Sequence, residues 1–140
     1  MAKVQPASER SPERAKLSDS TVVFLVGNIE ATMPWYKRIG FEAYYFPPDL
    51  CVLRRDAVKI FLQQEDGYLK PDDPGFRQRG AWNVYIETDN GDALFQELSR
   101  QPDVTILRGL CRQEYGQIEF DVMDPNEYVL VLAQPVAKDA

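Results

Sequence analysis

The stretch E-Y-G-Q-I-E-F-D-V-M-D-P-N, residues 114–126, is the part of this sequence that says most about the fold. Polar and apolar side chains alternate over Gly116–Met123, which is typical of a β-strand with only one face in a core. Asp124-Pro125-Asn126 then predicts a turn, because Asp and Asn bond their own backbone and Pro fixes φ. One face of the strand holds Gln117, Glu119, Asp121 and Met123, and the other holds Ile118, Phe120 and Val122.

Working outward, the second half of the chain has the order strand, helix and three strands. Asp89 or Asn90 is placed to cap the helix, because both side chains accept hydrogen bonds from the first backbone N–H groups. The predicted ranges are a strand over Trp82–Thr88, a helix over Asp92–Arg100, and strands over Thr105–Arg108, Gly116–Met123 and Tyr128–Ala133.

The first half repeats this order. Asn28 is a suitable N-cap for a helix, and Gly40 is a natural stop because glycine adopts the left-handed conformation that ends many helices. The predicted ranges are a strand over Thr21–Val26, a helix over Ile29–Ile39, and strands over Glu42–Phe46, Leu50–Arg54 and Ala57–Gln63.

The repeated order predicts an α+β fold built from two βαβββ modules. We place the modules at 18–66 and 80–134 of one domain, 18–134, with an N-terminal tail over 1–17 and a linker over 67–79. One such module cannot bury its sheet alone. We therefore expect the two to form an open, curved, eight-stranded mixed sheet around a central cleft.

Composition excludes several classes of function. The 140 residues carry a net charge of −6 and no histidine, which argues against nucleic acid binding, Ser-His-Asp catalysis and the commonest transition-metal sites. Only Cys51 and Cys111 are present, too few for a disulfide scaffold and typical of a reducing compartment. We expect a cytoplasmic protein, because no secretory signal or membrane-spanning run is found.

Three stretches resemble the vicinal oxygen chelate superfamily, which includes glyoxalases, extradiol dioxygenases, epimerases and bleomycin-resistance proteins. F-L-V-G-N-I-E with W-Y and I-G-F, within 24–41, is similar to the family's first strand and helix. V-L-R-R-D-A-V-K-I-F at 52–61, and the stretch 114–126, are similar to the bleomycin-resistance branch, and the resemblance covers residues 20–134. Two positions depart from it. Ile118 stands where arginine is common, and Glu127 stands where the family has glycine, so we expect a different turn there.

The resemblance assigns the superfamily's metal ligands to four strand positions. The family uses His, Glu or Gln at these positions. This sequence has a threonine, a phenylalanine, a tryptophan and a valine there, and these side chains cannot hold a divalent ion. We therefore predict no metal and no cofactor. The four positions are Thr21, Phe61, Trp82 and Val131.

An aromatic and acidic cleft takes the place of the metal in this interpretation. The resemblance implies that Trp82 and Phe61 face the cleft, and alternation would then place Val84 and Ile86 beside Trp82, and Lys59 and Gln63 beside Phe61. Stacked rings and carboxylates suit a planar, cationic organic ligand. The predicted ligand-binding residues are Trp82, Phe61, Tyr115, Glu119, Asp121, Thr21, Val131 and Gln63.

The leading hypothesis is a metal-independent small-molecule binding protein of the glyoxalase/bleomycin-resistance type, which confers antibiotic resistance by sequestration. Homodimers with clefts built from both subunits are what the resemblance implies. The alternative is a metal-free lyase or isomerase in which burial raises the pKa of Glu119, a general base, with Tyr115 as acid. Structural roles also stay open: Glu119 could pair with Arg54 or Arg108, and Trp82 could fill the cleft as core.

Overall fold

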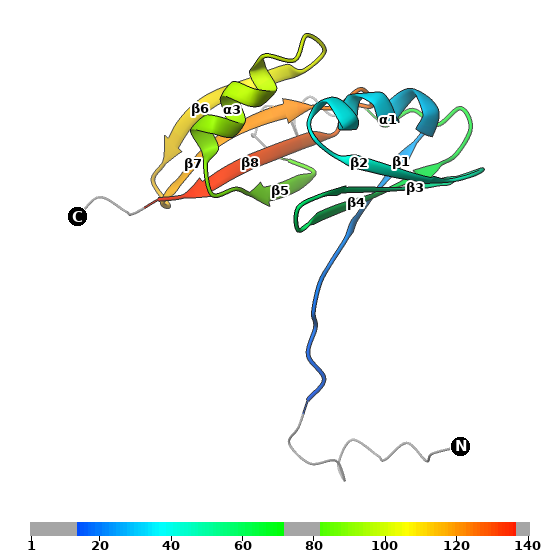
Figure 1. Ribbon diagram of the computed structural model, residues 1–140, viewed down its shortest axis with the longest axis horizontal. Helices are drawn as coiled ribbons and strands as arrows, with labels where there is room; N and C mark the ends of the chain where they lie inside the picture. Colours follow the sequence, from blue (N-terminus) through cyan, green and yellow to red (C-terminus); the bar gives the residue numbers. More distant parts are fainter. Residues whose placement is uncertain (1–13, 72–81, 137–140) are drawn as a thin grey trace.

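The computed structural model describes residues 14–71 and 82–136, which form eight strands and two helices in the predicted order (Figure 1). The α+β class and the two βαβββ modules are confirmed. The predicted tail and linker lie largely outside the described residues, so their boundaries remain predictions.

The first module forms one four-stranded mixed sheet in the order β1-β4-β3-β2, with β1 parallel to β4 and the other pairs antiparallel. Asn28 caps α1 as predicted, since its Oδ1 accepts from the N–H of Ala31 at 3.0 Å. Gly40 follows α1 with a φ of +92°, a conformation that favours glycine. The elements are β1 (Val22–Val26), α1 (Ile29–Arg38), β2 (Glu42–Phe46), β3 (Leu50–Arg55) and β4 (Val58–Gln64).

The second module repeats this topology in the order β5-β8-β7-β6, with β5 parallel to β8. Asn90 is the cap of α3, because its Oδ1 accepts from the N–H of Ala93 at 3.0 Å. The hydrogen bonds thus divide the eight strands into two open sheets of four. The elements are β5 (Val84–Glu87), α3 (Gly91–Ser99), β6 (Thr105–Gln113), β7 (Gln117–Met123) and β8 (Val129–Pro135).

Both helices lie on the same side of the two sheets (Figure 1). Side chains between the sheets and the two helices form the core, among them Phe24, Tyr36, Leu62, Phe120 and Leu130. The opposite side of each sheet has no helix over it in the described part of the chain, and we call these two surfaces the first and second open faces.

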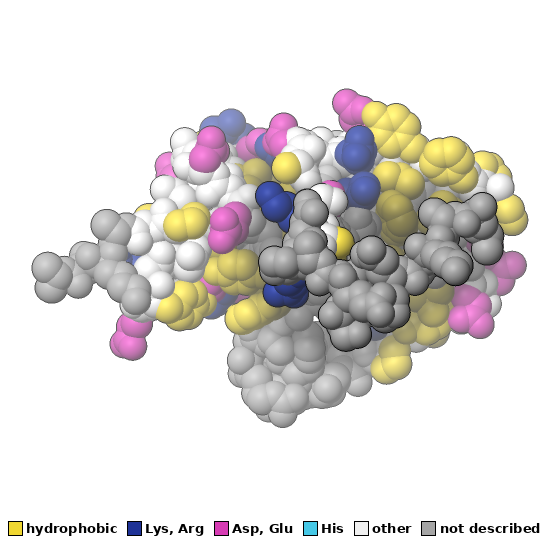
Figure 2. Space-filling model, turned by 90° about the horizontal axis from the view of Figure 1, so that it is seen from below, with side chains coloured by type: hydrophobic (Ala, Val, Ile, Leu, Met, Phe, Trp, Pro, Cys, Tyr) yellow, Lys and Arg dark blue, Asp and Glu magenta, His cyan; other side chains and the backbone are white. Residues whose placement is uncertain are grey.

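The first open face has an apolar centre. Its central row runs across the four strands, because Val23 pairs with Phe61, Phe61 with Val52, and Val52 with Tyr44. Val23, Tyr44 and Phe46 are between 46% and 57% exposed. Figure 2, seen from this side, shows hydrophobic side chains gathered over the first module, at the right. Exposed apolar side chains grouped in this way mark a candidate contact surface.

Polar contacts join the two modules. The Tyr36 hydroxyl donates to Asp124 at 2.6 Å, and the Tyr128 hydroxyl donates to the carbonyl of Leu25 at 2.7 Å. The Tyr128 ring also stacks on Phe24, with ring centroids 4.1 Å apart. Asp124, predicted as a turn former, therefore also anchors the β7–β8 turn to α1.

The β7–β8 turn corrects one expectation. Glu127 has a φ of +69°, so it takes the left-handed conformation that glycine would provide, and the turn keeps that geometry without glycine. Separately, none of the described helices is long and apolar enough to span a bilayer.

Candidate ligand-binding site

A buried carboxylate is the centre of the second open face. Glu119 on β7 is 0% exposed and accepts three hydrogen bonds: from the Tyr85 hydroxyl at 2.6 Å, the Tyr115 hydroxyl at 2.5 Å and Nη2 of Arg108 at 2.8 Å. Nη2 of Arg108 also donates to Asp121 at 2.8 Å. We call these five residues the carboxylate cluster.

The predicted pairing of Glu119 with an arginine is confirmed for Arg108. Arg108 comes from β6, where register shifts on both sides of it interrupt the regular ladder with β7. Its Nη2 lies between the two carboxylates, so one guanidinium serves both Glu119 and Asp121. Nε of Arg108 is buried and has no partner among the described residues.

The hydrogen bonds decide the charge of Glu119. Burial alone would raise the pKa of Glu119, but the hydrogen bonds from Tyr115, Tyr85 and Arg108 outweigh burial and hold this pKa below its usual value. Burial instead dominates at Asp121, whose pKa is raised despite Arg108. Glu119 is therefore a carboxylate at neutral pH, and the alternative in which burial raises its pKa does not hold.

The two phenols remain hydrogen-bond donors over the whole physiological range. Burial, together with the bond to Glu119, raises the pKa of Tyr115 to about 12. The same causes raise the pKa of Tyr85. Neither phenol is a ready proton donor near neutral pH, which also argues against the acid role predicted for Tyr115.

Tyr85 closes the surface above β8. It lies on β5, whereas its acceptor Glu119 lies on β7, and β8 runs between these strands. The phenol therefore crosses β8, above Val131 and Ala133, which are both 0% exposed. Val131 is thus on the predicted face but beneath the aromatic layer.

Aromatic rings remain accessible around the cluster. Trp82 is 43% exposed and Tyr115 is 52% exposed, so Trp82 does not fill the cleft as a core side chain. The rings of Trp82 and Tyr85 lie with centroids 5.5 Å apart. The exposed Tyr115 therefore contacts the buried, ionised carboxylate directly, and the exposed Trp82 lies next to Tyr85, which also bonds that carboxylate.

The predicted orientation of β5 was wrong. Val84 and Ile86 pack into the core on the helix side rather than facing the cleft, and Tyr85 points to the open face instead. Tyr85 is consequently a site residue that the sequence interpretation missed. The alternation Val-Tyr-Ile-Glu over 84–87 could have revealed it, because β-branched residues favour the buried face.

The remaining predicted residues belong to the first module. Phe61 and Gln63 on β4 share the first open face with Lys59, as predicted, because Ile60 and Leu62 between them are buried. Nζ of Lys59 lies 5.8 Å from the centroid of the Phe61 ring. Thr21 immediately precedes β1. The predicted site is thus divided between the two open faces.

The four positions that correspond to the superfamily's metal ligands do not fit a metal ion. Phe61 and Val131 offer no donor atom, the indole of Trp82 is only a hydrogen-bond donor, and Thr21 supplies a single hydroxyl. Elsewhere in the described ranges, no three Cys, Asp or Glu side chains are grouped so as to hold one. Arg108 already lies between the carboxylates of the acidic pair Glu119 and Asp121 and bonds both.

No protein family model matches the chain, and no curated protein sequence matches it. Solved structures do. A glyoxalase/bleomycin resistance protein/dioxygenase from Alicyclobacillus acidocaldarius has a TM-score of 0.68 and 13% identity, over 86% of this chain and 92% of that one. The bleomycin-binding protein from Streptomyces verticillus, complexed with copper(II)-bleomycin, has a TM-score of 0.62 and 20% identity, over 89% and 100%.

A third similar structure is the bleomycin resistance determinant encoded on the transposon Tn5, with a TM-score of 0.63 and 17% identity over 85% of this chain and 98% of that one. Identities this low establish a common fold. The resemblance inferred from the sequence is confirmed at that level: this chain has the vicinal oxygen chelate fold.

Proposed function

We propose that this chain is a small-molecule binding protein that sequesters a planar organic cation, with no metal or cofactor and no chemical step. The observation that carries the proposal is the buried, ionised Glu119, which bonds the exposed Tyr115 and also bonds Tyr85, the neighbour of the exposed Trp82 ring. A cation that stacks on these rings also approaches a fixed negative charge.

The energetics favour such a ligand. Stacking on each ring contributes about 0.5–1.5 kcal/mol beyond area burial, and a cation over an aromatic face contributes about 0.5–2 kcal/mol. The Tyr115 hydroxyl donates to a carboxylate, which makes its ring richer in electrons and a better cation partner. Neutral planar molecules would gain only the stacking.

A second copy of this chain would complete the cleft. Phe61 and Gln63 lie on the first open face, and none of their contacts in the described part of the chain links them to the carboxylate cluster. The exposed Val23, Tyr44 and Phe46 on that face support a homodimer, because burying them favours association. In this proposal, the first open face of one subunit covers the second open face of its partner.

Fluorescence provides the test, since the two tryptophans differ in exposure. Trp35 is 4% exposed and Trp82 is 43% exposed. Titration with proflavine, a planar cation, should quench the fluorescence of Trp82 until the site is saturated. The proflavine recovered afterwards should be chemically unchanged. Naphthalene-2-sulfonate, a planar anion, should bind much more weakly. Equal binding of the two probes would overturn the proposal.

Variants sharpen this test. Trp82→Phe should remove the quenching, and Glu119→Gln should weaken proflavine binding by about tenfold, because a fixed charge near the cation is lost. Glu30→Gln is the matched control, since Glu30 is an exposed carboxylate on α1 without a contact to the cluster. Unchanged binding in Glu119→Gln would exclude the carboxylate from the site.

The geometry does not support the lyase or isomerase alternative. The hydrogen bonds that Glu119 accepts from Tyr115, Tyr85 and Arg108 lower its pKa, which makes it a weaker base. The enzyme alternative would regain support if the protein turned over a substrate in the presence of a chelator and Glu119→Gln abolished that turnover. Antibiotic resistance and a cytoplasmic location are the biological setting that sequestration would suit, and both remain proposals.

A further inference from the structure

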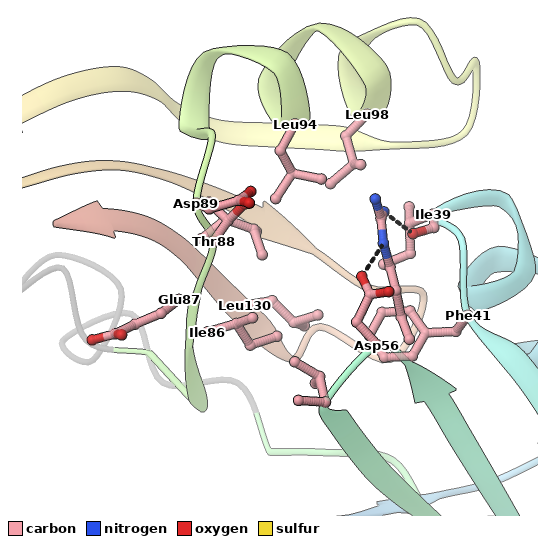
Figure 3. Close-up of a pocket in the computed structure, with 14 residues that line it drawn as sticks. Ile39, Phe41, Asp56, Ile86, Glu87, Thr88, Asp89, Leu94, Leu98 and Leu130 are labelled. Atoms are coloured by element: carbon pink, nitrogen blue, oxygen red, sulfur yellow. Dashed lines mark hydrogen bonds and ion pairs between the residues drawn. The ribbon is translucent and has the colours of Figure 1, made fainter.

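A cavity of about 360 Å³ lies between the two modules, away from the carboxylate cluster (Figure 3). Leu130 and Leu132 line it, whereas Val131, which alternates with them on β8, belongs to the second open face. The cavity is therefore on the helix side of the second sheet. Pockets that hold small organic molecules usually measure roughly 300–1,000 Å³, so this one fits a small ligand.

The inner surface of the cavity is apolar and belongs to both modules. In Figure 3, Leu94 and Leu98 of α3 lie above it and Ile86 and Leu130 lie below. The first module contributes the side chains that follow α1 and those of the β3–β4 turn. The buried apolar lining consists of Ile39, Phe41, Ile86, Leu98, Leu130 and Leu132.

The polar lining of the cavity is mostly acidic. Asp56, Glu87 and Asp89 are exposed carboxylates, and Arg55 is the one cation among the lining residues. The charge of Arg55 is already matched, because its guanidinium donates to both carboxylate oxygens of Glu97 at 2.8 and 3.0 Å. Nε of Arg55 also lies 3.8 Å from Oδ2 of Asp56, so Arg55 is shared by two carboxylates. Glu87 points away from the cavity in Figure 3, and the excess of negative charge at the cavity comes from Asp56 and Asp89.

Arg55 also forms a wall of the cavity, and Glu97 holds it in place. Arg55 lies at the end of β3 and Glu97 lies on α3, so the pair joins the two modules directly. Nη1 of Arg55 donates to the carbonyl of Ile39 at 2.8 Å as well, which fixes the guanidinium at this position. A guanidinium held by three hydrogen bonds is a rigid boundary rather than a side chain free to enter the space.

We propose that this inter-module cavity is a second small-molecule site, which takes an amphipathic organic cation. The apolar group of the ligand packs against Leu94, Leu98 and Ile86, and its ammonium group lies between Asp56 and Asp89. Because the ligand contacts both modules, binding strengthens their association. The site is independent of the proposed binding at the open faces.

Nuclear magnetic resonance tests this directly with three probes of similar shape. The probes are 2-phenylethylammonium, the neutral 2-phenylethanol and the anionic 3-phenylpropionate. The ammonium should cause saturable shifts of the backbone amides of 55–58 and 86–89, the alcohol should bind more weakly, and the acid should bind least. Equal affinities, or shifts of the ammonium confined to Trp82 and Tyr115, would overturn the proposal.

Two kinds of variant locate the site. Leu94→Trp fills the cavity and should abolish the saturable shifts, whereas Leu107→Trp, on an exposed leucine of β6 outside the lining, should not. Asp56→Asn and Asp89→Asn should each weaken the ammonium about threefold and leave the alcohol unchanged. Asp92→Asn, on α3 but outside the lining, is the matched charge control.

The outcomes decide the proposal separately from the open-face site. Retained shifts in a folded Leu94→Trp protein, or an absence of saturable shifts with every probe, would refute it. If Leu94→Trp fails to fold, the two Asp→Asn variants still decide, because a carboxylate at the mouth must discriminate the ammonium from the alcohol. Trp82→Phe should leave this binding intact, whatever it does to proflavine.

Discussion

Glu119 illustrates how a carboxylate can be buried without becoming neutral. Two phenols and a guanidinium donate to it, which provides three of the strongest kinds of hydrogen bond that a protein offers. The favourable bonds exceed the cost of desolvation, so the pKa falls rather than rises. A base with this environment is poor, and a fixed negative charge is the chemistry that remains.

Glu119→Gln should destabilise the protein at neutral pH by about 1–3 kcal/mol, because charged hydrogen bonds are lost in a buried position. A carboxylate with a lowered pKa stabilises the fold above its unfolded pKa, about 4.3, and loses this contribution as the pH falls through the folded pKa. The difference in unfolding free energy between the wild type and Glu119→Gln should therefore shrink below about pH 4.3.

Urea unfolding at several pH values measures this difference. Asp121 has a raised pKa and acts in the opposite direction, so the wild-type profile alone does not isolate Glu119. The comparison with Glu119→Gln does isolate it. A difference that stays constant down to pH values well below 4 would mean that Glu119 is not an ionised acceptor.

The phenols make a second prediction at this scale. Tyr115 should lose its proton only near pH 12, and in Glu119→Gln its pKa should fall toward the ordinary value, since a carboxylate acceptor no longer opposes the phenolate. Ultraviolet titration of Tyr115 by difference against Tyr115→Phe follows this change. Tyr44, whose phenol bonds Glu42 on the other sheet, serves as the internal control. An unchanged titration in Glu119→Gln would contradict the hydrogen bond.

Residue chemistry could be predicted better than residue orientation. The polar face of 117–123 follows from alternation, and charge predicts that Glu119 pairs with an arginine, although the sequence did not decide between Arg54 and Arg108. Tyr85 was missed because the orientation of β5 was taken from Trp82, which precedes the strand and does not obey its alternation. One misplaced residue at a strand end reverses the face of every residue after it.

Among the elements, the β7–β8 turn holds a residue in a conformation that suits glycine. Glu127 has a φ of +69°, a conformation that costs a residue with a Cβ roughly 1–2 kcal/mol. Glycine avoids this cost, but the greater conformational freedom of the unfolded chain offsets roughly 0.5–1 kcal/mol of the gain. Glu127→Gly should therefore stabilise the protein by about 0.5–1 kcal/mol. Chemical denaturation checks this, and Glu127→Ala should give no such gain.

Strand β6 marks the limit of pattern analysis at this scale. The predicted strand Thr105–Arg108 ends where the apolar alternation ends, yet β6 continues to Gln113. Register shifts between Ile106 and Arg108, and between Arg108 and Cys111, break the period of two while pairing with β7 continues. Arg108, which bonds both carboxylates, lies between these two shifts, so the irregular part of the strand contributes a residue of the site.

At the scale of the molecule, the modules are joined by polar anchors as much as by apolar packing. Tyr36→Phe removes the hydrogen bond to Asp124. Because Asp124 is buried and would lose this partner, the variant should be destabilised by about 1–2 kcal/mol. Tyr45→Phe is the control, because its hydroxyl bonds the carbonyl of Pro48 in an exposed position, at 3.3 Å. In thermal unfolding, Tyr36→Phe should lower the midpoint temperature clearly more than Tyr45→Phe does. Equal decreases would mean that Tyr36 does not anchor the two modules.

The proposed dimer gives the prediction with the widest reach. Phe46→Asp places a charge on the first open face, where Phe46 is 57% exposed, and should convert a dimer to a monomer in sedimentation velocity. Leu69→Asp changes a leucine that is 86% exposed but outside the sheets, and should remain a dimer. If the cleft needs both subunits, the folded Phe46→Asp monomer should also lose most of its affinity for proflavine, although its carboxylate cluster is intact. If the wild type sediments as a monomer and still binds proflavine, the whole site lies on one chain, above Glu119. The first open face would then have no role in completing the cleft.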